Sequence, residues 1–261
     1  MLKTEKIITK EYGIIGNPLS HSYSPTFFNE KFVQKGIKSA YHAFDIASIE
    51  GFLPIVEQRP LMRGFNVTIP YKQEVMPYLH QIDSNAQAIG AVNVVKVETK
   101  DGKPYLTGYN TDWYGFTRSI QPLLKPWHTK ALVLGTGGAS KAITYALTQL
   151  GITYKLASRT PKDGQFSYQD ITPAIMEEYT IIINTTPVGM FPNIKECPNI
   201  PYQYITNKHL AFDLTYNPIR TLFLQQAEMK GATIRNGWEM FVYQALRSYQ
   251  IWEGVEWTHR F

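Results

Sequence analysis

Short apolar runs alternate with stretches of helical spacing along the first part of the chain. The apolar runs predict strands at residues 12–16, 41–44 and 64–68. Between these runs, residues 25–35 and 48–57 predict helices. In the first of these helices Phe28 and Phe32 lie one turn apart, and Gly36 is placed to cap its end.

A hairpin signal follows. Asp101-Gly102 separates two strand-like stretches, residues 92–97 and 104–107, and this dipeptide is typical of a two-residue turn. The first part of the chain therefore predicts a mixed sheet that combines β-α-β units with an antiparallel hairpin.

The second part is more regular. Residues 131–134 predict a short strand that runs directly into a glycine-rich turn. The helix after this turn has an apolar face and ends at Gly151; its face consists of Ala142, Ile143, Ala146, Leu147 and Leu150. Further strands are expected at 152–157, 180–183 and 210–214, with a helix at 219–230. This alternation predicts a parallel, doubly wound sheet.

A last helix, at about residues 238–252, has no strand after it. We expect it to return and pack on the first domain. The predicted fold is thus α/β with two domains: residues 1–112 joined by 237–261, and a Rossmann-type domain over 113–236.

Composition narrows the class of protein. A chain of 261 residues with 44% hydrophobic and 18% charged residues can build two domains with cores of their own. The single cysteine, Cys197, excludes an internal disulfide framework and is typical of a reducing compartment. The six histidines are scattered, so no metal site is expected.

The net charge of +5 is spread along the chain without a basic run, which argues against a nucleic-acid partner and favours small anionic ligands. No apolar run approaches the roughly 20 residues that span a bilayer, and no signal-peptide core follows the first lysines. We expect a cytoplasmic protein without a membrane partner. A monomer is favoured over a homodimer, because no extended apolar stripe requires a second copy.

Gly135-Thr136-Gly137-Gly138-Ala139-Ser140 follows a predicted strand and opens a predicted helix. In that context glycines allow the backbone to approach a pyrophosphate at the helix N-terminus, although a plain structural turn is the alternative. About 20 residues later, where an NAD site carries an acidic residue, the chain has Ser158, Arg159 and Thr160. This favours NADP over NAD, because arginine pairs with a 2′-phosphate.

A second group of polar residues lies at the ends of predicted strands. Asn66 and Thr68 alternate along one strand and face the same side, and Asn93 and Asn110 end other strands. Lys72 and Asp112 follow these strands. Taken singly, Lys72 could be a solvated lysine and Asp112 a helix cap. Together with the amides and hydroxyls they fit a polyhydroxylated ligand that undergoes proton transfer. The loop at 184–190, with Thr186, also follows a strand, where ligand crevices form, although an ordinary connecting loop fits these residues equally well.

Ordered motifs run along nearly the whole chain. They are Gly16-Asn17-Pro18-Leu19-Ser20-His21-Ser22-Tyr23-Ser24-Pro25, Asn66-Val67-Thr68-Ile69-Pro70-Tyr71-Lys72, Gly108-Tyr109-Asn110-Thr111-Asp112, the glycine turn, Asp213-Leu214-Thr215-Tyr216-Asn217-Pro218, Asn236-Gly237, Tyr243-Gln244-Ala245 and Trp252-Glu253-Gly254. On these motifs the chain closely resembles the shikimate dehydrogenase family. The resemblance implies an NADP-dependent interconversion of 3-dehydroshikimate and shikimate in the route to aromatic amino acids.

The resemblance also implies roles for single residues. Lys72 and Asp112 become the catalytic pair, and the substrate-binding residues are Ser22, Ser24, Asn66, Thr68, Asn93, Tyr216 and Gln244. The residues assigned to the cofactor are Gly135, Gly137, Gly138, Ala139, Ser158, Arg159, Thr160, Thr186, Gly237 and Met240.

Some positions depart from the family pattern. Phe28 replaces a frequent histidine, Val94 a threonine and Ser158 an asparagine, while Trp238 and Phe241 are bulkier than usual. The serine side chain at 158 is shorter than asparagine, so it reaches less far as a hydrogen-bond donor toward a 2′-phosphate. Three alternatives stay open: a broader quinate/shikimate dehydrogenase, an enzyme for amino-substituted shikimate analogues, and a non-catalytic shikimate sensor. Retention of Lys72 and Asp112 argues against the sensor, and the two serines favour shikimate over quinate.

Overall fold

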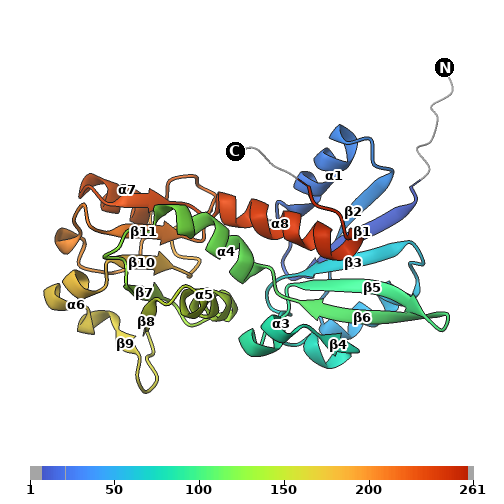
Figure 1. Ribbon diagram of the computed structural model, residues 1–261, viewed down its shortest axis with the longest axis horizontal. Coiled ribbons are helices and arrows are strands. Elements are labelled where there is room, and N and C mark those ends of the chain that lie inside the picture. The colour runs from blue at the N-terminus through green and yellow to red at the C-terminus, as the bar shows by residue number, and fades with distance from the viewer. Residues whose placement is uncertain (1–7, 21, 258–261) are drawn as a thin grey trace. The chain divides into compact units, whose positions relative to one another are not determined.

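The computed structural model describes residues 8–20 and 22–257. The chain forms two compact units (Figure 1). Unit 1 comprises Met1–Thr111 together with Ala245–Phe261, and unit 2 comprises Asp112–Gln244. Within the described residues each unit is built around one six-stranded sheet.

The sheet of unit 1 has the order β2-β1-β3-β5-β6-β4. Its strands are β1 (Lys10–Gly16), β2 (Ser39–Asp45), β3 (Met62–Val67), β4 (Gln81–Ile82), β5 (Val94–Lys100) and β6 (Lys103–Tyr109). Strand β1 pairs in parallel with β2 and β3, whereas β5 is antiparallel to both β3 and β6. Its helices are α1 (Ser24–Gln34), α2 (Phe52–Glu57) and α3 (Ser84–Ile89). The prediction of a mixed sheet is confirmed.

The predicted hairpin joins β5 to β6. Asp101 and Gly102 have φ angles of 52° and 74°, the positive values that a two-residue turn of this kind needs at both positions. The helix expected at 48–57 begins as a single 3-10 turn, Ile49–Gly51, before α2.

The sheet of unit 2 is entirely parallel, with the order β12-β11-β10-β7-β8-β9. Its strands are β7 (Lys130–Leu134), β8 (Thr153–Ser158), β9 (Phe166–Ser167), β10 (Ile181–Asn184), β11 (Leu210–Asp213) and β12 (Thr233–Arg235). Its helices are α4 (Asp112–Ile120), α5 (Gly138–Gln149), α6 (Pro173–Glu178), α7 (Leu222–Met229) and the first part of α8 (Trp238–Glu253).

Alternate residues of the central strands of unit 2 enter two different cores. Leu132 and Ile182 belong to one hydrophobic cluster, while Val133 and Ile183 belong to another. A sheet buried on both faces in this way explains why these strands are continuous apolar runs in the sequence. The predicted doubly wound domain is confirmed.

The predicted start of helix α7 was wrong. The helix expected from residue 219 begins at Leu222, because Thr221 accepts the Leu224 N–H and caps it. Ile219 lies outside the helix and is 73% exposed. Strands β4, β9 and β12 were not predicted, since two or three residues are too few to show a period.

The last helix, α8, returns to unit 1 as predicted, but only from Ala245 onward. Its first half belongs to unit 2, although all of 237–261 was expected to join the first domain. The Trp252 indole N–H donates to the Val95 carbonyl oxygen at 3.0 Å. Gly64 leaves room for this ring, because a Cβ there would lie 2.1 Å from Trp252 Nε1. Glu253 accepts a hydrogen bond of 2.7 Å from the Tyr12 hydroxyl and pairs with Lys10. These contacts fix the end of α8 on the sheet of unit 1.

Candidate active site

A buried polar cluster in unit 1 surrounds Asn66, in β3. The Tyr41 hydroxyl donates to Asn66 Oδ1 at 2.7 Å, and Asn66 Nδ2 donates to Ser248 Oγ at 3.1 Å. Asn66 Nδ2 also lies 3.4 Å from the Asn93 carbonyl oxygen, which is longer than an ordinary N–H···O bond. The carboxamide of Asn66 is therefore held at both ends by its neighbours.

Asn93, just before β5, is the second buried amide. The Thr111 N–H donates to Asn93 Oδ1 at 2.7 Å, and Asn93 Nδ2 donates to Thr111 Oγ1 at 3.1 Å. The hydroxyls of Thr111 and Ser248 lie 3.3 Å apart. In contrast, Asn110 Nδ2 donates to the Ala91 carbonyl oxygen at 2.9 Å. Thr111 and Ser248 thus connect Asn93 to Asn66.

Ser24 is the first residue of α1 and is buried. Its side chain partly opposes the rise that burial gives to the pKa of Tyr41. Ser22 precedes α1 in a loop, where its N–H donates to the Leu19 carbonyl oxygen at 2.9 Å. The Leu19 N–H in turn donates to Asp45 Oδ2 at 3.0 Å. The hydrogen bonds through Thr111 and Ser248 therefore join two predicted substrate residues, Asn66 and Asn93, into one network, and they do not include Ser22 or Ser24.

Three members of this network had no role assigned from the sequence: Tyr41, Thr111 and Ser248. Thr111 lies inside one of the quoted motifs. Ser248 comes four residues after Gln244 on a predicted helix, and this spacing places both on one face. Tyr41 carried no signal beyond its place in an apolar strand.

Lys72 and Thr68 lie in the segment that follows β3. The Val92 N–H donates to the Lys72 carbonyl oxygen at 2.7 Å, and the buried neighbour Tyr71 donates its hydroxyl to the Ile46 carbonyl oxygen at 2.6 Å. The Thr68 N–H donates to the Ile15 carbonyl oxygen at 2.9 Å. The backbone at both positions is thus fixed, while both side chains are only half-buried.

Asp112, Met240 and Gln244 belong to unit 2. Asp112 is the first residue of α4 and is buried, and a carboxylate at a helix N-terminus is stabilised by the helix dipole. A Cβ at Gly115 would lie 2.4 Å from the Met240 carbonyl oxygen, so this glycine lets α4 approach α8 closely. The Met240 side chain packs in a core cluster of the unit, and Gln244 is half-buried.

The glycine turn leads from β7 into α5, as predicted. Gly135 has a φ of +104°, and a Cβ there would lie 2.7 Å from Thr186 Cγ2. Gly137 and Gly138 differ: neither has a positive φ, and a Cβ at either would meet nothing within 4 Å. The fold itself requires glycine at Gly135 but leaves open space at the other two. The N-terminus of α5 therefore has room for a ligand to approach its backbone N–H groups.

Ser158, Arg159 and Thr160 lie where β8 ends. Ser158 is buried and its Oγ accepts the Thr160 N–H at 3.2 Å, which leaves the hydroxyl proton for another acceptor. Arg159 and Thr160 are exposed. A guanidinium and hydroxyls at this position fit a phosphate group, and the residues present therefore fit the 2′-phosphate of NADP.

A buried carboxylate organises the loops after β10 and β11. Asp213 accepts hydrogen bonds from the Thr221 hydroxyl at 2.6 Å, the Thr215 N–H at 3.0 Å and Asn184 Nδ2 at 3.1 Å. Asn184 Oδ1 accepts the Thr186 hydroxyl at 2.6 Å and the Thr186 N–H at 3.1 Å. Burial raises the pKa of Asp213 to about 6, although these hydrogen bonds oppose the shift.

Tyr216 stands in an aromatic cluster at the start of α8. Its ring centroid lies 5.3 Å from that of Phe241 and 6.1 Å from that of Trp238. Gly237 has a packing role, since a Cβ there would lie 1.9 Å from the Leu214 carbonyl oxygen. The two bulky residues that depart from the family pattern therefore pack beside a predicted substrate residue.

The part of the chain that the structure describes has neither a metal-binding cluster nor a membrane-spanning helix. No group of three His, Cys, Asp or Glu side chains there could hold a metal ion. No helix over these residues is long and apolar enough to cross a bilayer.

Comparison with known proteins gives consistent matches. The family described as the shikimate dehydrogenase substrate binding domain matches residues 14–95. A curated relative from Methanococcus aeolicus, named shikimate dehydrogenase (NADP(+)), is 37% identical over 95% of this chain and 93% of its own length.

Solved structures agree with the sequence match. The shikimate 5-dehydrogenase of Thermus thermophilus, in complex with NADP(H) and shikimate, is 30% identical with a TM-score of 0.79, over 95% of this chain and 94% of that chain. The enzyme of Listeria monocytogenes, in complex with shikimate and NAD, is 28% identical with a TM-score of 0.85, over 97% and 95% of the two chains.

Proposed function

This chain belongs to the shikimate dehydrogenase family, and we propose that it catalyses the reversible, NADP-dependent reduction of 3-dehydroshikimate to shikimate. The observation that carries the proposal is the joint presence of the buried amide network in unit 1 and the glycine turn with its arginine in unit 2. The first supplies hydrogen bonds for a polyhydroxylated ring, and the second suits a phosphorylated dinucleotide.

In unit 1, we assign the substrate to the residues around Asn66 and Asn93. Because both amides are already held by buried neighbours, a ligand would meet polar groups with fixed directions. Ser22 and Ser24 are assigned to the carboxylate. Their hydroxyls would donate to the carboxylate, since a carboxylate accepts and does not donate. Thr68 completes the proposed set in unit 1, and Tyr216 and Gln244 are the substrate residues that we assign in unit 2.

Lys72 and Asp112 are proposed to handle the proton. Reduction of the ketone needs a proton at the carbonyl oxygen, and the ammonium group of Lys72 can donate it. The same positive charge stabilises the oxyanion that develops. Asp112 is proposed to accept the hydrogen bond of the substrate hydroxyl and to orient it. If the two residues act on one proton, the loss from replacing both will be much smaller than the product of the single losses.

In unit 2, NADPH would supply the hydride when bound. The chain's own residues bind it: backbone N–H groups of Gly135, Gly137, Gly138 and Ala139 are assigned to the pyrophosphate. The side chains of Ser158, Arg159 and Thr160 are assigned to the 2′-phosphate. Thr186, Gly237 and Met240 are proposed to lie along the remaining part of the cofactor.

Cell location and assembly are further parts of the proposal. Cys197 is half-buried and accepts a hydrogen bond from Gln226 at 3.3 Å, which is consistent with a reduced thiol in the cytoplasm. A monomer is proposed, and the molar mass in solution, measured by light scattering, would test it against a homodimer.

The test is the initial rate of the purified chain with shikimate or quinate, each paired with NADP or NAD. The proposal expects the highest kcat/KM for shikimate with NADP. Comparable values for quinate would support the broader alternative, and binding of shikimate without turnover would support a sensor. Absence of both binding and turnover would reject the proposal.

A further inference from the structure

We propose that Tyr41 is a positioning residue of the substrate site: its buried hydroxyl fixes the carboxamide of Asn66, so that the Asn66 N–H₂ group, and not its oxygen, is presented to a substrate oxygen. The inference rests on the function proposed above, and it adds a residue that does not itself bind substrate.

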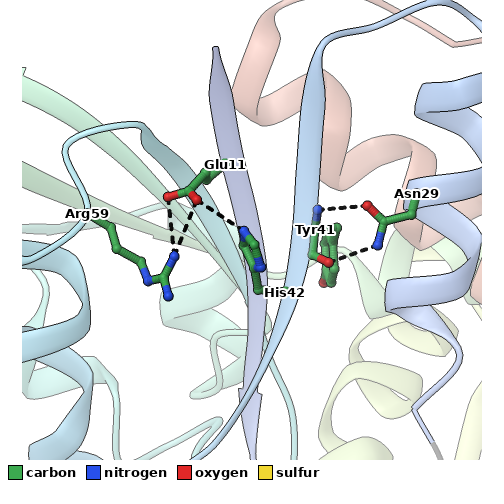
Figure 2. Close-up of polar contacts among 5 residues, drawn as sticks. All are labelled: Glu11, Asn29, Tyr41, His42 and Arg59. Carbon is green, nitrogen blue, oxygen red and sulfur yellow. Dashed lines mark hydrogen bonds and ion pairs between the residues drawn. The ribbon is translucent and has the colours of Figure 1, made fainter. Parts of the chain in front are cut away.

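Two consecutive residues of α1 hold Tyr41, one at its ring and one at its backbone. The Phe28 ring stacks on the Tyr41 ring, with centroids 4.6 Å apart and planes 7° from parallel. Asn29 binds the Tyr41 backbone at both polar groups: Asn29 Oδ1 accepts the Tyr41 N–H, and Asn29 Nδ2 donates to the Tyr41 carbonyl oxygen, each at 2.9 Å (Figure 2).

The next residue of β2 is fixed as well. His42 Nε2 lies 3.2 Å from Glu11 Oε1, and Arg59 binds the same carboxylate at 3.3 Å (Figure 2). Strand β2 is therefore anchored at two successive residues, to a helix by one and to β1 by the other. An anchored strand keeps the Tyr41 hydroxyl at one place.

Counting protons gives the direction of the hydrogen bonds. Asn66 Oδ1 can only accept, so the single hydroxyl proton of Tyr41 goes to it, at 2.7 Å. A hydroxyl could also accept from a flipped amide, so the orientation is decided by the Asn93 carbonyl oxygen, which only accepts and lies 3.4 Å from Asn66 Nδ2.

The other end of the amide agrees with that orientation. Asn66 Nδ2 donates one proton to Ser248 Oγ at 3.1 Å, and its second proton has only the 3.4 Å contact with the Asn93 carbonyl oxygen. A substrate oxygen is a better acceptor for that second proton. Without the Tyr41 hydroxyl, a flip of the amide would turn its oxygen toward the same substrate atom, and binding would weaken.

The plain alternative is that Tyr41 serves only the aromatic core. Tyr12 provides a matched control, because it is the direct neighbour of Tyr41 in the pairing of β1 with β2. Both tyrosines are buried, and both hydroxyls make a 2.7 Å hydrogen bond, Tyr12 with Glu253 and Tyr41 with Asn66. The ring of each also packs beside Trp252. Loss of either hydroxyl should have similar structural effects.

The experiment compares Tyr41→Phe and Tyr12→Phe in steady-state assays with shikimate and NADP. Tyr41→Phe should raise the KM for shikimate roughly 5- to 10-fold, the value of one hydrogen bond, with kcat and the KM for NADP nearly unchanged. Tyr12→Phe should lower the melting temperature without changing the KM for shikimate. An unchanged KM for shikimate in folded Tyr41→Phe, or an equal rise in both variants, would overturn the proposal.

A double-mutant cycle with Asn66→Ala shows whether Tyr41 acts through Asn66. In the Asn66→Ala background, Tyr41→Phe should have no further effect on the KM for shikimate; a full additional effect would refute the assignment. If Tyr41→Phe does not fold, Ser248→Ala gives a different test: the Tyr41 hydroxyl still holds Asn66 Oδ1 in this variant, so the KM for shikimate should stay near that of the wild type. A roughly 5- to 10-fold rise in that KM would contradict the role given to Tyr41. A wild-type chain that neither binds nor oxidises shikimate would reject the proposed function and, with it, this inference.

Discussion

The polar sites of the two units are built from different kinds of side chain. In unit 1 the network around Asn66 and Asn93 is made of neutral amides and hydroxyls, each tied to buried neighbours. In unit 2 the corresponding loops are organised by one buried charge, Asp213, while Arg159 and, in the glycine turn, Thr136 and Gly137 are exposed.

This difference matches the ligands proposed for the two units. A ring with several hydroxyls is distinguished by the direction of each hydrogen bond, so its partners need fixed orientations. A phosphate is recognised mainly by charge and by backbone N–H groups, so its site needs space and a cation. The difference also predicts which variants affect substrate, cofactor or stability.

The largest effect is expected at Lys72. Lys72→Ala should lower kcat by about 10²- to 10⁴-fold, the usual loss when a general acid–base group is removed. The fold should remain intact, since the lysine side chain is half-exposed; circular dichroism and melting temperature check this. Turnover within a few-fold of the wild type would remove Lys72 from the mechanism.

The next effect concerns the cofactor. Arg159→Ala should raise the KM for NADP roughly 10- to 150-fold, because a hydrogen bond to a charged group is lost. The KM for NAD, which has no 2′-phosphate, should hardly change. Equal changes for both cofactors would show that Arg159 does not select between them.

Asp213 should make the stability of the chain depend on pH. Its pKa of about 6 lies above its ordinary value of 3.8, so the folded state binds the proton more tightly. The contribution of Asp213 to the free energy of unfolding is fully present below about pH 4 and is lost as the pH rises through 6. The total loss is about 3 kcal/mol. Urea unfolding of wild type and Asp213→Asn across this range measures it.

In Asp213→Asn that part of the pH dependence should disappear, while the neutral network of unit 1 contributes none. If the variant keeps the full slope between pH 4 and 6, another group is responsible for it.

A smaller effect separates two glycines of one turn. Gly138→Ala should leave the melting temperature unchanged or raised, because the position is helical and its Cβ meets nothing within 4 Å. It should raise the KM for NADP, by about 5- to 150-fold if a methyl group collides with the pyrophosphate. Gly135→Ala should instead cost about 1–3 kcal/mol of stability, because of its φ of +104°. The opposite pattern would contradict the assignment of Gly138 to the cofactor.

Local signals in the sequence predicted much of this fold. Asp101-Gly102 specified a hairpin, and the apolar face from Ala142 to Leu150 specified α5, because both depend on residues close in the chain. The start of α7 was placed wrongly, since the period of the apolar residues continued through the loop before Thr221.

The network around Asn66 could be predicted only in part. Tyr41 and Ser248 lie 25 and 182 residues from Asn66 in the chain. Their hydrogen bonds depend on how β2, β3 and α8 pack, and no local pattern specifies that packing. The amides themselves were found because they lie at the ends of strands, where ligand-binding residues gather.

The division of roles between the units is tested most directly by separate binding measurements. Calorimetry would give the Kd of shikimate and the Kd of NADP for wild type, Asn66→Ala and Arg159→Ala, each ligand titrated alone. The account predicts that Asn66→Ala weakens shikimate binding only and that Arg159→Ala weakens NADP binding only. If either folded variant weakened both ligands equally, or neither, the assignment of substrate to unit 1 and cofactor to unit 2 would be contradicted.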